Sequence, residues 1–149
     1  MTDIRVREAK EPDLPSIEKL VKELIKSLGG TEAITVQQAV NNCKNLLKEA
    51  NSYVYVSEID GDVVGFINFT TRKTILHQGL SGLIDELVVN EGYQRKGVGK
   101  RLVLTAREKC KQLGCCEIEV NTEKTNNKAR EFYKKYGFKK RGFLFEMQV

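Results

Sequence analysis

Apolar and polar positions recur along the chain with two periods, and these periods separate predicted strands from predicted helices. Ile4 and Val6 alternate with arginines, which predicts a short first strand. Apolar residues then recur at helical spacing over residues 14–28, and again over residues 36–50. The first third of the chain therefore predicts one strand followed by two amphipathic helices.

Residues that commonly begin and end helices support both of these helices. Asp13 stands before the first helix as a candidate N-cap, and Gly29 and Gly30 follow it, where glycine often ends a helix. Thr35 and Gln38 have the spacing of a capping box at the start of the second helix. Each predicted helix thus has a chemical reason for its boundary.

The rest of the chain alternates between strand and helix patterns. Strand-forming residues at 53–56 and 63–69 flank Asp60 and Gly61, a pair typical of a hairpin turn, and the apolar run 83–89 predicts a further strand. The pattern then predicts a helix over 98–113, a strand over 116–120, a helix over 126–136, a final strand over 143–149 and, optionally, a short strand over 138–140. The order β-α-α-β-β-β-α-β-α-β predicts a single mixed α/β domain over residues 1–149.

Composition narrows the class of protein. The chain has 149 residues, of which 40% are hydrophobic and 30% charged, and this suits one globular domain. It shows neither a signal-like apolar segment nor an apolar run approaching ~20 residues, so we expect a cytoplasmic protein with no membrane partner. The four cysteines include no C-x-x-C pair. We expect no metal site, with His77, the only histidine, in an exposed loop.

Two adjacent cysteines, Cys115 and Cys116, fall within a predicted strand. Because neighbouring strand residues face opposite sides, they are poorly placed for a disulfide. Cys116 has the alternation of the core-facing residues Ile118 and Val120, so we expect Cys116 to be buried and Cys115 exposed. Neither has a histidine nearby in sequence that would activate it as a nucleophile.

The positive charge of the chain points to an anionic partner. The formal net charge is +5 and the pI is about 9.0, which fits either nucleic acid or a phosphorylated cofactor. The sequence has no helix-turn-helix, RNA-binding aromatic motif or zinc finger, so we expect no nucleic-acid partner. Basic residues are locally dense over 134–141 and over 95–101, which follows the strand predicted at 83–89.

That basic segment predicts a phosphate site. It contains Gln94, Gly97 and Gly99 between an apolar strand and an amphipathic helix. The first turn of a helix has unpaired N–H groups and the positive end of the helix dipole. Glycines there leave the backbone open to a phosphate, while basic side chains add charge beside it. The basic side chains are Arg95, Lys96, Lys100 and Arg101.

Two segments resemble the GCN5-related N-acetyltransferase (GNAT) family. Gln94, Gly97 and Gly99 match its motif A, Gln/Arg-x-x-Gly-x-Gly/Ala. The stretch from Asn126 to Phe138 resembles its closing signature, N-x-x-A-x-x-F-Y-x-x-x-G-F. The resemblance covers nearly the whole chain and implies the GNAT fold, a mostly antiparallel sheet whose fourth and fifth strands splay apart. It also implies direct acetyl transfer from acetyl-CoA to a primary amine through a ternary complex.

The resemblance carries over a set of cofactor-binding residues. Leu87 and Val89 would offer backbone groups to the pantetheine arm, and the N–H of Val88 or Val89 would stabilise the thioester oxygen. Asn126 would contact the cofactor or cap its helix, two roles that the sequence leaves open. The residues implied to bind acetyl-CoA are Leu87, Val88, Val89, Gln94, Arg95, Lys96, Gly97, Val98, Gly99, Lys100, Asn126 and Tyr133.

Three side chains are candidates for proton transfer. By resemblance, Tyr133 would protonate the leaving thiolate, and the motif match favours this role over packing of the tyrosine in the core beside Phe132. A base must also take a proton from the amine, and Asp85 and Glu86 are the carboxylates on the central strand. A bulge in this part of the family's strand prevents alternation from choosing between them. We prefer Glu86, with pairing to a basic residue as the alternative role for either carboxylate.

The acceptor and the assembly stay open at the level of sequence. The acceptor is expected to be a small-molecule or protein amine, bound by the first two helices with their loop at about 28–35 and by the C-terminal strands. A binding module that recognises acyl-CoA without turnover is the competing function, and Tyr133 with the acidic pair argues against it. A homodimer is left open, with the apolar final strand as a contributor.

Overall fold

The computed structural model describes residues 3–29 and 34–149. Its centre is a five-stranded sheet in the order β1-β2-β3-β4-β5, in which the first four strands are antiparallel and β5 is parallel to β4. The strands are β1 (Arg5–Glu8), β2 (Ser52–Ile59), β3 (Asp62–Arg72), β4 (Leu80–Val89) and β5 (Cys115–Val120). The α-helices among these residues are α1 (Leu14–Ser27), α2 (Val36–Leu46), α3 (Val98–Gln112) and α4 (Asn127–Lys135).

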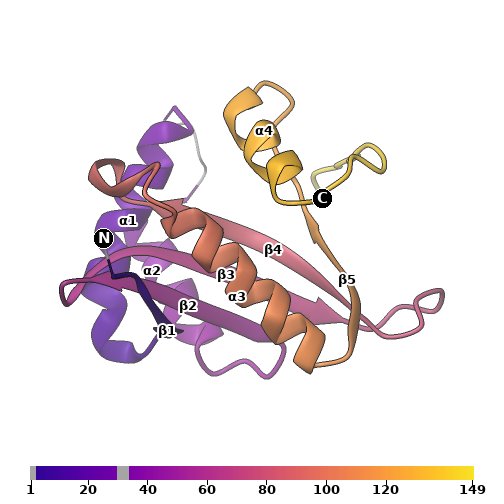
Figure 1. Cartoon of the computed structure of the whole chain (residues 1–149), viewed down its shortest axis with the longest axis horizontal. Coiled ribbons are helices and arrows are strands. Elements are labelled where there is room, and N and C mark those ends of the chain that lie inside the picture. The colour runs from indigo at the N-terminus through magenta and orange to yellow at the C-terminus, as the bar shows by residue number, and fades with distance from the viewer. Residues whose placement is uncertain (1–2, 30–33) are drawn as a thin grey trace.

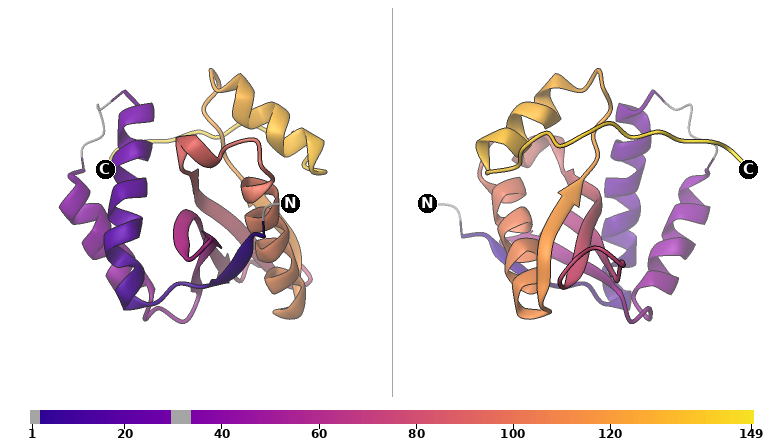
Figure 2. Two further views of the ribbon diagram at one scale, coloured as in Figure 1. Left: turned by 60° about the vertical axis from the view of Figure 1, so that its left-hand side comes forward. Right: turned by 90° about the vertical axis from the view of Figure 1, so that its right-hand side faces the viewer.

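The helices make three layers with the sheet. Helices α1 and α2 lie together against one face, and α3 lies against the other, with α4 above the end of the sheet where β5 finishes (Figures 1 and 2). Two 3₁₀ turns, Glu11–Asp13 and Glu91–Tyr93, precede α1 and follow β4. The mixed α/β fold is as the sequence predicts. None of the described helices is long and apolar enough to span a membrane.

Alternating strand residues build a separate core on each face of the sheet. Ile67, Phe69 and Ile84 face α3 and pack with Leu102 and Ala106 of that helix. On the other face, Val56, Phe66 and Val88 pack with Ile17 and Leu20 of α1. Complete burial of a side chain such as Leu102 stabilises the fold by roughly 1.5–3 kcal/mol. The two cores hold β3 and β4, the strands that carry the site residues, between the helical layers.

Local signals in the sequence correctly placed several turns. Asp60 and Gly61 both have positive φ, 51° and 83°, as the hairpin between β2 and β3 requires. Thr35 and Gln38 form the expected capping box at α2, with the Gln38 N–H donating to Thr35 Oγ1 at 3.1 Å. Gly29 follows α1 as predicted, whereas Gly30 lies outside the described residues.

Asp13 does not cap α1 with its side chain, contrary to expectation. It occupies the N-cap position, but its carboxylate accepts two hydrogen bonds from the Arg7 guanidinium, each 2.8 Å long. The Lys10 N–H donates to the same carboxylate at 2.8 Å. These partners hold the pKa of Asp13 below its ordinary value. Asp13 therefore secures the link between β1 and α1.

Strands β4 and β5 separate partway along their length. They pair from Leu80 with Cys115 to Ile84 with Val120, where β5 ends, while β4 continues to Val89. The side of β4 that faces away from β3 is therefore unpaired over residues 85–89 within the described chain. This is the splay that the family resemblance implied.

The prediction of which β5 cysteine is buried is wrong. The pairing of β4 with β5 steps from Leu80–Cys115 to Ser81–Glu117, so Cys116 is the extra residue of a bulge. Cys116 is exposed, and Cys115 packs instead against the core that contains Cys110. The bulge reverses the alternation that had placed Cys116 inside.

The predicted final strand also does not form. Residues 138–149 join no strand ladder of the described chain, so neither the optional strand over 138–140 nor the strand over 143–149 is present. An alternating pattern supplies strand propensity, but a strand also needs a neighbouring edge to bond. In Figure 2 this segment leaves α4 and crosses towards the side of α1 and α2 without joining the sheet.

Candidate active site

The first turn of α3 presents an open anion site. Gly97 occupies its N-cap position with φ 85° and ψ 6°, and within the described residues no side chain caps this helix. A Cβ added to Gly97 would meet no described atom within 4 Å, so the space beside the turn is free. Unpaired N–H groups and the helix dipole therefore face open space, which suits a phosphate.

The structure gives a different reason for the glycine at position 99 from the one expected, which was access for a phosphate. A Cβ at this position would lie 3.2 Å from Cζ and 3.3 Å from Cε1 of Phe132, closer than most real Cβ contacts. The missing side chain therefore lets the α4 ring pack directly on the first turn of α3. Of the two glycines in the motif, Gly97 leaves space for a ligand and Gly99 leaves space for α4.

Side chains join the anion loop to the other elements of the site. The Gln94 amide Nε2 donates to the Val89 carbonyl at 3.3 Å, and Lys128 Nζ donates to Gln94 Oε1 at 3.0 Å. Gln94 thus links the end of β4 to α4. Asn126 Oδ1 accepts from the Ala129 N–H at 3.0 Å, so of the two roles left open, the capping role is the one observed.

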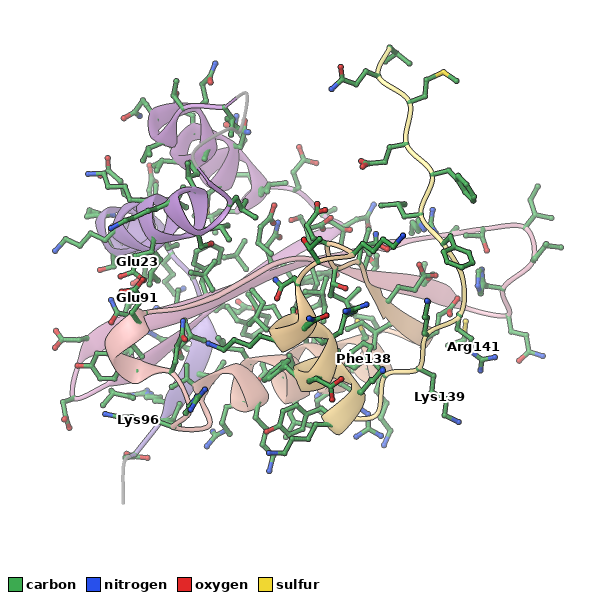
Figure 3. The ribbon with its side chains drawn as sticks, turned by 90° about the horizontal axis from the view of Figure 1, so that it is seen from above. Glu23, Glu91, Lys96, Phe138, Lys139 and Arg141 are labelled. Carbon is green, nitrogen blue, oxygen red and sulfur yellow. The ribbon has the colours of Figure 1, made fainter. Side chains whose placement is uncertain are left out.

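Basic side chains surround the same loop. Lys96 Nζ lies 5.3 Å from the centre of the Tyr93 ring, and Lys100 Nζ lies 5.9 Å from that of Tyr136. Figure 3 shows Lys96 at the turn that leads into α3 and Phe138 at the far end of α4. The aromatic contacts restrain the two ammonium groups next to the open helix turn, which adds positive potential there.

The unpaired length of β4 offers backbone groups to a ligand. The Asn90 N–H donates to the Val64 carbonyl of β3 at 2.8 Å. Antiparallel pairing alternates along a strand, so the N–H of Val88 also points towards β3. The N–H and C=O groups of Leu87 and Val89 point the other way, into the opening beside β5.

A bulge in β4 sets the positions of the two candidate carboxylates. Glu86 pairs with Asn68, and Ile84 with Phe69, so Asp85 is the extra residue. Thr70 Oγ1 donates to Asp85 Oδ2 at 3.1 Å, while Asn68 Nδ2 donates to Glu86 Oε2 at 2.8 Å. Each carboxylate is therefore held by a different hydrogen bond from β3.

The surroundings raise the pKa of both carboxylates. Desolvation is the main cause for Glu86 and for Asp85, and the nearby charge of Asp85 raises the pKa of Glu86 further. Although solvent reaches both side chains, the protein atoms around them remove enough water to disfavour the charged forms. A carboxyl with a raised pKa is a stronger base when ionised, which suits proton abstraction near neutral pH.

Sequence reasoning missed the residues that position Glu86. Asn68 is only 7% exposed, and its Oδ1 accepts from Ser52 Oγ at 3.3 Å while its amide holds Glu86. The sequence feature that could have indicated this role is Asn68 itself, a single amide side chain within the apolar run 63–69. A buried amide needs partners, and here it forms a relay from β2 through β3 to β4.

Tyr133 lies at the buried end of the site. It is 9% exposed, and its ring makes edge contacts with Phe132 at 5.2 Å and Phe138 at 5.3 Å between centroids. Burial raises the pKa of its hydroxyl to about 12. The phenol therefore keeps its proton at neutral pH, as a proton donor must.

His77 belongs to a different region. It contacts Thr74 and Glu117, and the ligand atoms of His77, Glu117 and Glu119 lie within 4.8 Å of one another. This group is separate from the loop at Gly97 and from the Tyr133 ring. The expectation that the protein needs no metal stays a prediction.

Solved structures share this arrangement of elements. The aminoglycoside N-acetyltransferase AAC(6')-Iy, solved with CoA, has a TM-score of 0.87 over 100% of this chain and 96% of its own, at 15% identity. A Bacillus halodurans C-125 structure described as a transcriptional regulator has a TM-score of 0.86 over 99% of this chain and 100% of its own, at 24% identity. These two structures therefore share the fold of this chain.

Sequence comparison identifies the family. Residues 17–138 match the Acetyltransferase (GNAT) family. An aminoalkylphosphonate N-acetyltransferase of Salmonella typhimurium is 29% identical over 140 residues, which cover 94% of this chain and 88% of that protein. An uncharacterised N-acetyltransferase of Archaeoglobus fulgidus is 32% identical over 130 residues, 85% of this chain and 88% of its own. The chain belongs to the GNAT family and is an N-acetyltransferase, as its two motifs predict.

Proposed function

We propose that the protein transfers an acetyl group directly from acetyl-CoA to a primary amine while both are bound. The observation that carries this proposal is the uncapped first turn of α3 beside the unpaired residues 85–89 of β4. The turn would bind the pyrophosphate, with Arg95, Lys96 and Lys100 adding charge. Leu87 and Val89 would bind the peptide-like pantetheine arm through their backbone groups.

The acetyl-CoA site would therefore extend along two elements. Gln94, Val98 and Gly99 shape the turn between them, and Val88 holds β4 in place through its packing against α1. Asn126 orders the start of α4, the helix whose Tyr133 would face the same opening. The fit rests on free space at Gly97 and on backbone groups of β4 that no neighbouring strand pairs, although the Val89 carbonyl accepts from Gln94.

Three groups of this chain would carry the chemistry. Glu86 accepts a proton from the ammonium form of the acceptor, directly or through a water, with Asp85 as the alternative base. The amine nitrogen then bonds to the acetyl carbon, while the N–H of Val89 stabilises negative charge on the thioester oxygen, and the nitrogen gives up a second proton to solvent as the neutral amide forms. As the C–S bond breaks, Tyr133 donates its proton to the leaving thiolate and later regains one from solvent.

Burial affects the pKa of the proton donor and would affect that of the leaving thiol in the same direction. Tyr133 has a pKa of about 12, which would make it a poor donor to a thiolate in water. Burial also raises thiol pKa values, as it does for Cys110, whose pKa is about 12. Desolvation of the leaving thiolate would raise its basicity in the same direction, which favours proton transfer from Tyr133.

Steady-state kinetics tests the proposal. Initial rates of thiol release are measured while acetyl-CoA and an amine are both varied, using an aminoalkylphosphonate, glucosamine 6-phosphate and an aminoglycoside, the acceptor types named in related proteins. Direct transfer gives intersecting double-reciprocal lines for the amine that is used. Parallel lines would contradict it, because they indicate an acetyl-enzyme intermediate. Acetyl-CoA binding without release of thiol for any amine would favour the binding module.

A further inference from the structure

One histidine and two glutamates come together at the end of the sheet away from the Gly97 turn. His77 lies in the loop between β3 and β4, while Glu117 and Glu119 lie on β5. An imidazole nitrogen and two carboxylate oxygens, one from each residue, all lie within 4.8 Å of one another. In Figure 1 this loop and the start of β5 lie towards the right of the view, at the opposite end of β4 from the anion loop. The group is therefore separate from the acetyl-CoA site.

The geometry of β5 places both carboxylates on one face of the strand. Residues two apart in a strand point the same way, so Glu117 and Glu119 point away from Ile118, which packs in the α3 core. The bulge at Cys116 sets this arrangement, because it brings Glu117 rather than Cys116 opposite Ser81 of β4. The two carboxylates thus face the same space as the loop that carries the histidine.

A close backbone contact fixes that loop against the start of β5. A Cβ added to Gly79 would lie 2.3 Å from the Gly114 carbonyl oxygen, so only glycine allows this approach. The His77 N–H donates to Thr74 Oγ1 at 3.2 Å, and the same hydroxyl contacts Nδ1 of the imidazole. With Nδ1 held by Thr74, Nε2 faces Glu117. The ring is therefore oriented by a partner on its other nitrogen, as histidine ligands of metals commonly are.

One carboxylate oxygen of the group has no hydrogen-bond donor. Glu117 Oε1 is shielded from solvent and accepts no hydrogen bond from the residues that the structure describes. His77 Nε2 touches this oxygen, but without the alignment of a hydrogen bond. An oxygen that loses its water without gaining a donor is destabilising, and more so when it carries charge. A cation bound between the nitrogen and the oxygen would remove this cost.

A buried hydroxyl positions the second carboxylate. Ser81 is 1% exposed, and its Oγ donates to Glu119 Oε1 at 3.4 Å. Hydrogen bonds of this kind, from groups behind the ligands, orient carboxylates that bind metals. Thr74 and Ser81 thus hold one ligand on each side of the group.

Solvent can reach the group from an adjoining cleft. The cleft has a volume of about 330 Å³ and is lined by residues 73–74, 77–80 and Gly114. The side chains of His77 and Glu117 are 34% and 37% exposed, so a hydrated ion has a path to them and can keep water ligands. Lys73, which also lines the cleft, is exposed, so solvent and salt screen its charge.

We propose that His77, Glu117 and Glu119 bind a Zn²⁺ ion that ties the loop between β3 and β4 to β5. Imidazole nitrogen and carboxylate oxygen are ordinary zinc ligands, and three protein ligands leave a fourth position for water. Bonds of roughly 2.0–2.2 Å at tetrahedral angles separate ligand atoms by roughly 3.3–3.6 Å. Rotation of the glutamate side chains brings the observed group to this spacing. A nitrogen ligand disfavours Mg²⁺ and Ca²⁺, which prefer oxygen ligands.

This site reverses the expectation from sequence that the protein has no metal site. That expectation depended on a single histidine and on the absence of a C-x-x-C pair. Neither feature shows that the fold brings the histidine to two carboxylates of a distant strand. The ion would have a structural role, because the group is at the other end of β4 from the unpaired residues 85–89.

Calorimetric titration of the full chain with zinc chloride, after treatment with EDTA and its removal, tests the site. The wild type is expected to bind one Zn²⁺ per chain, more tightly than Mg²⁺, and Glu117→Gln to bind it about 10–100-fold more weakly with an unchanged circular dichroism spectrum. Glu123→Gln removes the same charge from an exposed position outside the group and is expected to keep wild-type affinity. A wild type that does not bind Zn²⁺, or equal affinity in Glu117→Gln, would overturn the proposal and leave a simple contact between His77 and Glu117.

Two further measurements separate this site from other modes of zinc binding. Cys116→Ser is expected to keep wild-type affinity, and loss of binding in it would assign the ion to a thiolate and overturn the proposal. Hydrogen exchange of residues 73–79 is expected to slow when Zn²⁺ is added to the wild type and to stay unchanged in Glu117→Gln. Exchange in the wild type that Zn²⁺ does not slow would contradict a link between the loop and β5.

Discussion

At the scale of residues, loss of surrounding water prepares Glu86 and Tyr133 for opposite roles. It raises the pKa of both groups, which keeps the Tyr133 proton in place and makes the Glu86 carboxylate more basic. Each is also held in position, Glu86 by Asn68 and Tyr133 by two aromatic rings. The same physical effect therefore supports a proton donor on α4 and a proton acceptor on β4.

Replacing Tyr133 by phenylalanine tests the donor. The ring contacts stay while the hydroxyl is lost, so we expect kcat to fall by about 10²–10⁴-fold with little change in affinity for acetyl-CoA. Steady-state rates and calorimetric titration with acetyl-CoA measure the two effects. Tyr53→Phe on β2 is the control and is expected to keep wild-type rates. An undiminished kcat in Tyr133→Phe would assign the ring to packing alone.

The pH dependence of kcat/KM tests the base. Glu86 must be ionised to accept a proton, so activity is expected to rise with pH through its raised pKa. In Glu86→Gln this rise of kcat/KM with pH should disappear together with most of the activity. The Asp85→Asn variant should still show the rise. If the rise is lost only in Asp85→Asn, then Asp85 is the base.

The same raised pKa predicts a change in stability. The folded protein binds the Glu86 proton more tightly than the unfolded chain does, so this contribution is complete below the ordinary pKa and is lost as pH rises through the raised one. Glu86→Gln cannot ionise and can still accept from Asn68. Its melting temperature is expected to exceed that of the wild type at neutral pH, with the difference shrinking in acid. A variant that is less stable at neutral pH would contradict the sign.

At the scale of elements, the contact between α3 and α4 shapes the cofactor side of the site. Gly99 on the first turn of α3 lies against Phe132 of α4, and Lys128 of α4 bonds to Gln94 of the loop. The position of Tyr133 therefore depends on how closely α4 approaches the anion loop. A small change at this contact should alter both the affinity for acetyl-CoA and the rate of turnover.

Gly99→Ala tests that contact. The added methyl group would lie within 3.4 Å of the Phe132 ring, so we expect a loss of roughly 1–3 kcal/mol in unfolding free energy and weaker binding of acetyl-CoA. Gly99→Ala/Phe132→Leu removes the crowding and should recover much of both. Chemical denaturation measures the unfolding free energy of each variant, and calorimetric titration measures its affinity for acetyl-CoA. Failure of the second change to recover either property would show that Gly99 matters for another reason.

Local patterns were sufficient to predict elements whose causes lie within a few residues. The hairpin at Asp60 and the capping box at Thr35 depend only on neighbouring side chains, and both are present. The bulge at Cys116 and the missing final strand depend on which distant strand is available for pairing. The alternation of apolar residues does not contain that information.

At the scale of the whole molecule, the sheet brings together residues that the sequence keeps far apart. Sequence motifs identified the loop at Gly97 and the Tyr133 helix, because each is contiguous. The relay from Ser52 through Asn68 to Glu86 could not be seen, since it arises from the register of three strands. The splay of β4 from β5 then places the anion loop beside unpaired backbone groups.

Binding of acetyl-CoA to the turn at Gly97 is the central claim, and thermal unfolding tests it most directly. At a hundred times its Kd, a ligand stabilises a protein by about 2.7 kcal/mol, which is roughly 5–10 °C for a domain of this size. We expect acetyl-CoA to produce such a shift in the wild type and none in Gly97→Asp, whose carboxylate would occupy the free space and repel phosphate. No shift in the wild type, or equal shifts in both proteins when the variant is folded, would contradict the account.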